Sequence, residues 1–180
     1  MRTFEWAIED IVAAYPYLEL NHHAAMAVAL MMPSSSPCTF SVSIKGFEVE
    51  ALEGDQEFSL HVSWSSQWED AAGRIVRTHQ RAQIVEGGAI ALAALLFAHL
   101  MRNSELDVTV VSDRADYWLL QQQRALEISG TERIRELPRR FREKFRQLLE
   151  NHRGWDGYVV LCCFAESKRA IQWTYHTQSR

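Results

Sequence analysis

The chain has 180 residues, of which 47% are apolar and 23% charged, with a formal net charge of −4. This length and composition predict one globular domain with a sizeable core, spanning residues 1–180. The slightly acidic balance excludes binding to nucleic acid or an anionic membrane through overall charge, although a local basic patch can still do so.

The N-terminal segment MRTFEWAIEDIV carries acids early and does not have the apolar core of a signal peptide. The longest apolar stretch, residues 89–101, is too short to span a bilayer and indicates a buried helix. Cys38, Cys162 and Cys163 show no CxxC spacing, which favours buried free thiols. We therefore expect a cytoplasmic protein without a membrane partner.

The first third of the chain predicts a helix followed by a hairpin. Residues 3–15 have helical spacing of apolar side chains, and residues 22–32 fit either a second helix or a buried strand. The run PSSSP then breaks the chain. Alternating apolar and polar residues at 38–46 and 58–64 predict an antiparallel pair, which Phe47 and Val49 either extend or follow as a further strand.

Residues 67–101 have a helical apolar period, interrupted by Gly87-Gly88. Because glycine costs about 1 kcal/mol relative to alanine inside a helix, we expect a kink or the meeting of two helices there.

The remaining segments predict three strands, a helix and two further strands. Residues 106–112, 115–120 and 124–129 are short, apolar and closely connected. Pro138 suits the first turn of a helix over 138–151, residues 158–164 read as a central strand, and 170–177 as an edge strand. The fold class expected is α+β or α/β, with a mixed sheet in 67–180 preceded by a helix and hairpin layer in 1–66.

The order helix, three strands, helix, strand over roughly residues 84–164 resembles the core of the PD-(D/E)XK nucleases, the restriction-endonuclease-like superfamily. In that family one acid lies near the start of the second core strand. A second acid and a lysine lie two residues apart on the third strand, and the first helix often adds another acid. The resemblance assigns these acids to Asp116, Glu127 and Glu86, and it places Ser129 where the lysine belongs.

This resemblance implies a Mg²⁺-dependent nuclease with Asp116, Glu127 and Ser129 in the active site and Glu86, Asp116 and Glu127 as metal ligands. Mg²⁺ prefers hard oxygen ligands and commonly takes one or two protein carboxylates. Residues 127 and 129 share one strand face. The missing positive charge would then come from Arg124, Arg133 or Lys144.

Local structure offers another reading of the same residues. Ser129 and Glu132 have the S-x-x-E spacing of a capping box, and Asp113 and Asp116 flank a stretch typical of a tight turn. Glu86 can equally be an ordinary acid near a helix start.

Residues 132–153 hold eight basic and four acidic residues, a net charge of +4 in a chain of −4. Such a segment favours contact with phosphates through Arg133, Arg139, Arg140 and Lys144. The alternative is a solvated helix face with pairs such as Arg139–Glu143.

The seven histidines show no ligand spacing, so we expect no zinc site. The six tryptophans are expected in the core or an interface. Three functions remain open: a metal-dependent nuclease; a non-catalytic binding or scaffold subunit of a bacterial defence or mobile-element assembly, with a protein partner or a second copy; and an α+β interaction protein unrelated to nucleases.

Overall fold

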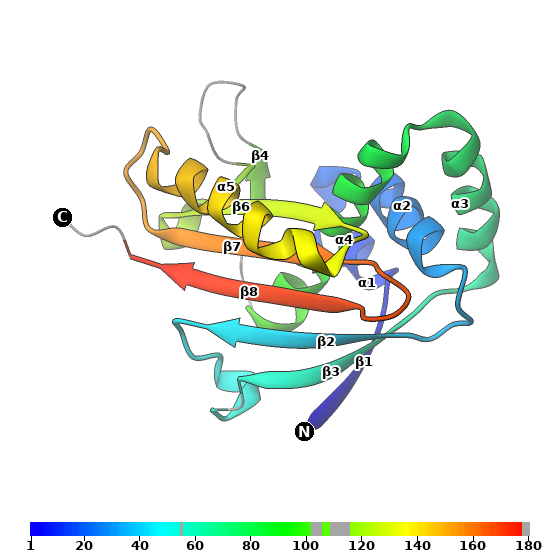
Figure 1. Ribbon diagram of the computed structural model, residues 1–180, viewed down its shortest axis with the longest axis horizontal. Helices are drawn as coiled ribbons and strands as arrows, with labels where there is room; N and C mark the ends of the chain where they lie inside the picture. Colours follow the sequence, from blue (N-terminus) through cyan, green and yellow to red (C-terminus); the bar gives the residue numbers. More distant parts are fainter. Residues whose placement is uncertain (55, 102–105, 109–115, 178–180) are drawn as a thin grey trace.

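The computed structural model describes residues 1–54, 56–101, 106–108 and 116–177. One eight-stranded mixed sheet, in the order β1-β3-β2-β8-β7-β6-β5-β4, runs through these parts of the chain (Figure 1). With helices on both faces, it confirms the expected α+β or α/β class. The strands are β1 (Arg2–Ala7), β2 (Cys38–Lys45), β3 (Glu57–Ser63), β4 (Leu106–Val108), β5 (Tyr117–Leu119), β6 (Arg124–Thr131), β7 (Gly157–Cys163) and β8 (Ala170–His176).

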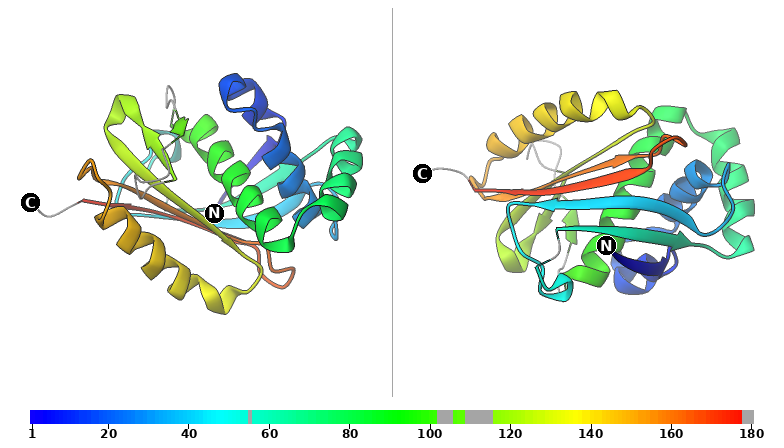
Figure 2. Two further views of the ribbon diagram at one scale, coloured as in Figure 1. Left: turned by 90° about the horizontal axis from the view of Figure 1, so that it is seen from above. Right: turned by 60° about the horizontal axis from the view of Figure 1, so that its bottom comes forward.

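Helix α5 (Leu137–Leu149) lies alone on one face of the sheet, and the helices labelled α1 to α4 in Figure 1 lie on the opposite face (Figure 2). Strand β6 is covered on both sides, because Leu126 and Ile128 belong to the core on the α4 side while Ala125 belongs to the core beneath α5. The helices are α1 (Asp10–Ala14), α2 (Asn21–Met31), α3 (Ser66–Thr78), α4 (Arg81–Leu100) and α5 (Leu137–Leu149).

The region that resembles a nuclease core has strand order β4-β5-β6-β7. Strands β4, β5 and β6 pair antiparallel, and α5 then carries the chain across to β7, which lies parallel to β6. The pairing of β5 with β6 ends at Leu126, whereas the pairing of β6 with β7 continues to Thr131. The second half of β6 therefore extends beyond its partner β5.

The predicted N-terminal helix over 3–15 is wrong in its first half. Residues Arg2–Ala7 form β1, which pairs parallel with β3, and only Asp10–Ala14 are helical. The ring of Phe4 packs edge-on against Phe58 of β3, with centroids 5.2 Å apart. Pairing with a distant strand thus outweighs the local helical period. The hairpin β2–β3 forms as predicted, but it continues the common sheet, and Phe47 and Val49 lie outside its strands.

The predicted meeting of two helices at Gly87-Gly88 is wrong, because both glycines lie inside α4. The break falls at His79-Gln80, between α3 and α4. A Cβ atom on Gly88 would lie 2.5 Å from Leu30 Cδ1 and 3.3 Å from the Cα of Ala27, both in α2. The glycines therefore let α2, which is a helix rather than a strand, approach α4 closely.

Strand β8 was predicted at an edge but lies between β2 and β7. Its Ile171 and Trp173 are fully buried. The alternating pattern arose because only one face of this strand is covered, not because it lacks a neighbour. The predicted strand residues 109–112 and the turn residue Asp113 lie outside the described parts of the chain.

Helix α4 is the one helix in the described ranges that is long and apolar enough to cross a membrane by length and composition. Most of it is buried within the protein, so it is the core helix of a globular domain.

Candidate functional site

Lys144 of α5 joins the two acids Asp116 and Glu127. Its Nζ donates to Oδ2 of Asp116 at 2.8 Å and to Oε2 of Glu127 at 3.0 Å. The Glu127 side chain is only 1% exposed and that of Lys144 16%, while Asp116 is one-third exposed. Residues 11 to 28 positions apart in the sequence thus meet in one partly buried cluster.

Asp116 is held against β6 by its backbone and its side chain. Its N–H donates to the carbonyl of Leu126 at 3.1 Å, and its Oδ2 accepts the N–H of Ile128 at 2.6 Å. The turn Leu120–Gln122, followed by Gln123 in a left-handed conformation, folds β5 back onto β6. The carboxylate therefore occupies the place next to β6 that a longer β5 would fill.

Glu127 lies on the face of β6 that α5 covers, where a carboxylate is costly unless it is neutralised. Burial, together with the nearby Asp116 charge, raises the pKa of Glu127 to about 8 despite the opposing effect of Lys144. Its Oε2 binds Lys144, but its Oε1 is buried without a hydrogen-bond partner in the described structure.

The lysine keeps its positive charge in this setting. Burial lowers the pKa of Lys144, but the carboxylates of Asp116 and Glu127 outweigh this effect, and the net shift is upward. Lys144 therefore remains an ammonium group at neutral pH. Burial and the Asp116 charge also raise the pKa of the neighbouring Tyr117 to about 12, so this phenol stays protonated.

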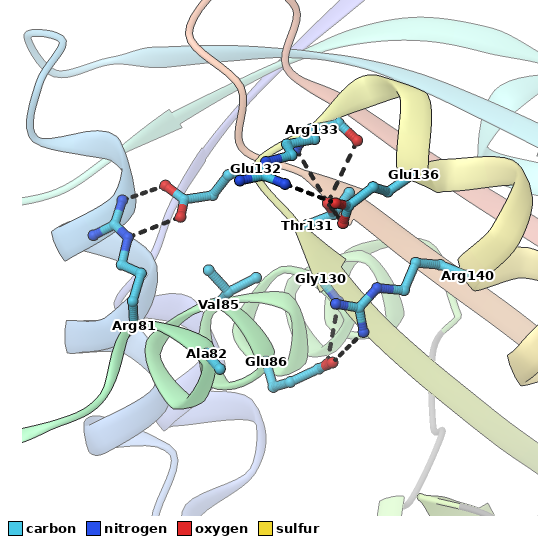
Figure 3. Close-up of a pocket in the computed structure, with 10 residues that line it drawn as sticks. All are labelled: Arg81, Ala82, Val85, Glu86, Gly130, Thr131, Glu132, Arg133, Glu136 and Arg140. Atoms are coloured by element: carbon cyan, nitrogen blue, oxygen red, sulfur yellow. Dashed lines mark hydrogen bonds and ion pairs between the residues drawn. The ribbon is translucent and has the colours of Figure 1, made fainter.

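Glu86 of α4 forms an adjacent cluster with Ser129, Gly130 and Arg140. Figure 3 shows Glu86 beside Gly130 and Arg140. Its Oε1 accepts the Ser129 hydroxyl at 3.1 Å and Arg140 at 3.3 Å, and its Oε2 accepts the N–H of Gly130 at 3.1 Å. The structure thus places Glu86 with Ser129 and Arg140, whereas Lys144 bonds to the other two predicted acids.

Two carboxylates accept backbone N–H groups in the second half of β6, which extends beyond β5. Asp116 accepts the N–H of Ile128, and Glu86 accepts the N–H of Gly130. These donors point to the side where β5 has ended, and a buried N–H without a partner is costly. The acids of the site therefore also satisfy the backbone of this strand.

Ser129 does not act as a helix cap, because it lies within β6 and its hydroxyl binds Glu86. Glu132, the other residue of the suggested capping box, forms a two-point ion pair with Arg81 of α4. Beside this pair lies a cavity of about 280 Å³ between α4 and the end of β6. Figure 3 shows its lining: Arg81, Ala82, Val85, Glu86, Gly130, Thr131, Glu132, Arg133, Glu136 and Arg140.

The four cations predicted to contact nucleic acid all have acidic partners in the chain. Arg139 pairs with Glu143 at 3.2 Å, as the solvated-helix alternative predicts, and Arg133 pairs with Glu136 at 3.5 Å. Arg140 and Lys144 point into the site. The exposed face of α5 also carries Arg142 and Arg146, for which the described structure shows no ion pair.

The sequence offers three cations near the two acids: Arg124, Arg133 and Lys144. In the described structure, Lys144 is the one that contacts Asp116 and Glu127. Arg124 instead lies over the ring of Tyr175, 5.5 Å from its centroid, and Arg133 binds Glu136. The sequence predicts Arg140 as a phosphate contact but does not place it beside Glu86 and Ser129. The available signal was its spacing, since residues 140 and 144 lie on the same face of a helix.

Trp118, two residues after Asp116, is buried beneath α5 rather than exposed at the site. It contacts Trp155 edge-on at 5.4 Å, and Arg153 lies over its ring. It anchors the short strand β5 that positions Asp116.

The chain was compared with family models, curated proteins and solved structures, and none of the three comparisons finds a match. The candidate site is therefore interpreted from its geometry alone.

The donor set fits a hard divalent cation. Within the described ranges no group of three or more His, Cys, Asp and Glu side chains is arranged to hold a metal ion. However, the carboxylates of Asp116 and Glu127 lie close enough to bind the same ammonium group, that of Lys144. Mg²⁺ commonly takes only one or two protein carboxylates. Once Glu127 loses its proton, its buried Oε1, which accepts no hydrogen bond in the described structure, is a further hard oxygen at this position.

Proposed function

We propose that this chain is a metal-dependent nuclease of the PD-(D/E)XK type that hydrolyses phosphodiester bonds, with the motif lysine moved from β6 to α5. The observation that carries the proposal is the position of Lys144 Nζ, within 3.0 Å of both Asp116 and Glu127. The sequence lacks a cation at residue 129, and α5 supplies one to the same pair of acids.

In this proposal Asp116 and Glu127 hold Mg²⁺, which when bound polarises a phosphate oxygen and lowers the pKa of bound water. Lys144 contributes a fixed positive charge in a site with little solvent, where such charges stabilise developing negative charge most effectively. Glu127 has to release its proton before it becomes an anionic ligand. Arg140 adds a second cation from the same face of α5, and it is held by Glu86 and Ser129.

The same geometry also supports a second candidate, a non-catalytic binding or scaffold subunit of a bacterial defence or mobile-element assembly. Lys144 already binds both acids, and Oδ2 of Asp116 also accepts the N–H of Ile128. In this candidate the cluster fixes α5 on the sheet, and the chain binds a protein partner or a second copy. We propose a cytoplasmic location in either case, in keeping with three buried free cysteines.

The deciding experiment incubates the purified chain with Mg²⁺ or Mn²⁺ and labelled single- and double-stranded DNA and RNA. Cleavage is expected for the wild-type chain, and loss of cleavage for Asp116→Ala and Glu127→Gln. Asp70→Asn, which changes an exposed acid on α3, serves as the matched control.

Unchanged cleavage by Asp116→Ala would overturn the assignment of the site. Absence of both cleavage and Mg²⁺ binding by calorimetry in the folded wild-type chain would favour the non-catalytic candidate. Circular dichroism of each variant establishes that a loss of activity is not a loss of fold.

A further inference from the structure

Two histidines from different helices meet on the surface away from the carboxylate cluster. His22 lies in the first turn of α2, and His79 directly follows α3. Their Nε2 atoms are 2.9 Å apart, and their ring centroids are 4.6 Å apart at an interplanar angle of 62°. The two residues are 57 positions apart in the sequence, so their spacing does not predict this contact.

The hydrogen bonds around His79 favour one tautomer of its ring. The hydroxyl of Thr78 donates to the carbonyl of Arg74 at 2.9 Å. Its oxygen is 2.8 Å from Nδ1 of His79. Because the hydroxyl proton is donated to the carbonyl of Arg74, this contact favours the tautomer that carries its N–H on Nδ1. Nε2 of His79 therefore presents a lone pair to His22, and an outer hydrogen bond of this kind is typical of metal-binding histidines.

We propose that His22 and His79 bind a divalent transition-metal ion of the zinc class, with water completing its coordination. A Zn–N bond is about 2.0–2.1 Å, so two nitrogens in a tetrahedral zinc site lie roughly 3.3 Å apart. With this tautomer of His79, the N–H of His22 Nε2 donates to Nε2 of His79 at 2.9 Å. Binding the ion therefore requires His22 to carry its proton on Nδ1, so that both Nε2 atoms offer a lone pair. The rings then turn, and the two nitrogens move apart by a few tenths of an ångström. His22 is exposed and His79 half-buried, which leaves room for water.

This site is independent of the proposed nuclease activity. Imidazole nitrogens suit Zn²⁺, Ni²⁺ and Cu²⁺, whereas the carboxylates of Asp116 and Glu127 suit Mg²⁺. The ion would connect the start of α2 to the end of α3. It would therefore stabilise the folded chain without taking part in chemistry at β6.

The test is a calorimetric titration of the full chain with ZnCl₂ in buffer that contains excess Mg²⁺, paired with thermal melts. We expect one Zn²⁺ per chain at this site and a melting temperature that rises with Zn²⁺. Both effects should disappear in His22→Ala and in His79→Ala. His152→Ala, which changes an exposed histidine elsewhere, should bind like the wild-type chain.

Two further variants test the assignment more closely. Thr78→Val removes the acceptor of the His79 Nδ1–H and should weaken binding about 10–100-fold. Glu127→Gln should leave Zn²⁺ binding unchanged, which separates this site from the carboxylate cluster. Equal Zn²⁺ binding by the wild-type chain and by folded His22→Ala, or no binding by the wild-type chain, would overturn the proposal.

Discussion

Lys144 and Glu127 are joined by a 3.0 Å hydrogen bond between α5 and β6, although 17 positions separate them in the sequence. The glutamate side chain is almost completely buried. The pair therefore brings a positive charge to the strand that carries Glu127 and Ser129.

The first prediction concerns Lys144→Met. If the lysine stabilises negative charge during phosphodiester cleavage, its removal should lower the rate by about 10²–10³-fold, which is typical for the loss of one such donor. The fold should persist, because Glu127 is mostly protonated at neutral pH and stays neutral without the lysine.

The control for this variant is Arg139→Met, which removes a cation of the same helix that binds only the exposed Glu143 in the described structure. Rates are measured under single-turnover conditions. Equal rates for the two variants would contradict the role of Lys144.

The second prediction concerns the pH dependence of stability. The pKa of Glu127 is raised from 4.5 to about 8 by burial and by Asp116. Between these pH values the folded chain holds a proton that the unfolded chain has lost, so the free energy of unfolding falls as the pH rises through this window. The total change is on the order of a few kcal/mol.

Glu127→Gln keeps this side chain neutral at every pH, so its stability should change less between pH 5 and pH 8 than that of the wild-type chain. Urea unfolding at several pH values measures the difference. Parallel curves for both proteins would show that the pKa of Glu127 is not raised.

The third prediction links metal binding to the same proton. At pH 7 most Glu127 side chains are protonated, and a metal ligand has to be deprotonated. Mg²⁺ affinity should therefore rise with pH up to about 8 and then level off. Calorimetry at pH 7 in buffers of different ionisation enthalpy should detect proton release. Mg²⁺ binding without proton release would place the ion elsewhere.

The fourth prediction concerns the contact between α2 and α4. Gly88→Ala would place a methyl group 2.5 Å from Leu30 Cδ1, so it should destabilise the fold by about 1–3 kcal/mol through overpacking. Gly73→Ala is the matched control within α3, where the nearest atom is the end of Arg77, 3.9 Å away. It should stabilise the fold by about 0.5–1 kcal/mol. Similar stability of the two variants would argue against a close helix contact.

Much of the fold could be predicted from local pattern. The hairpin β2–β3, the strand β6, the helix α5 and the buried strand β7 follow from apolar periodicity, because each buries one face or both. Strand β1 and the central place of β8 could not be predicted this way. Their partners, β3 for the first and β2 and β7 for the second, are distant in the sequence, and pairing is decided by the whole sheet.

The sequence by itself determined which acids were candidates for the site, namely Glu86, Asp116 and Glu127. It also determined that residue 129 carries no positive charge. Only the tertiary structure decided that Asp116 and Glu127 share Lys144, that Glu86 lies with Ser129 and Arg140, and that His22 meets His79. The physical reason is that periodicity fixes the face on which a side chain lies. Its partner depends on where a strand ends and how helices cross the sheet.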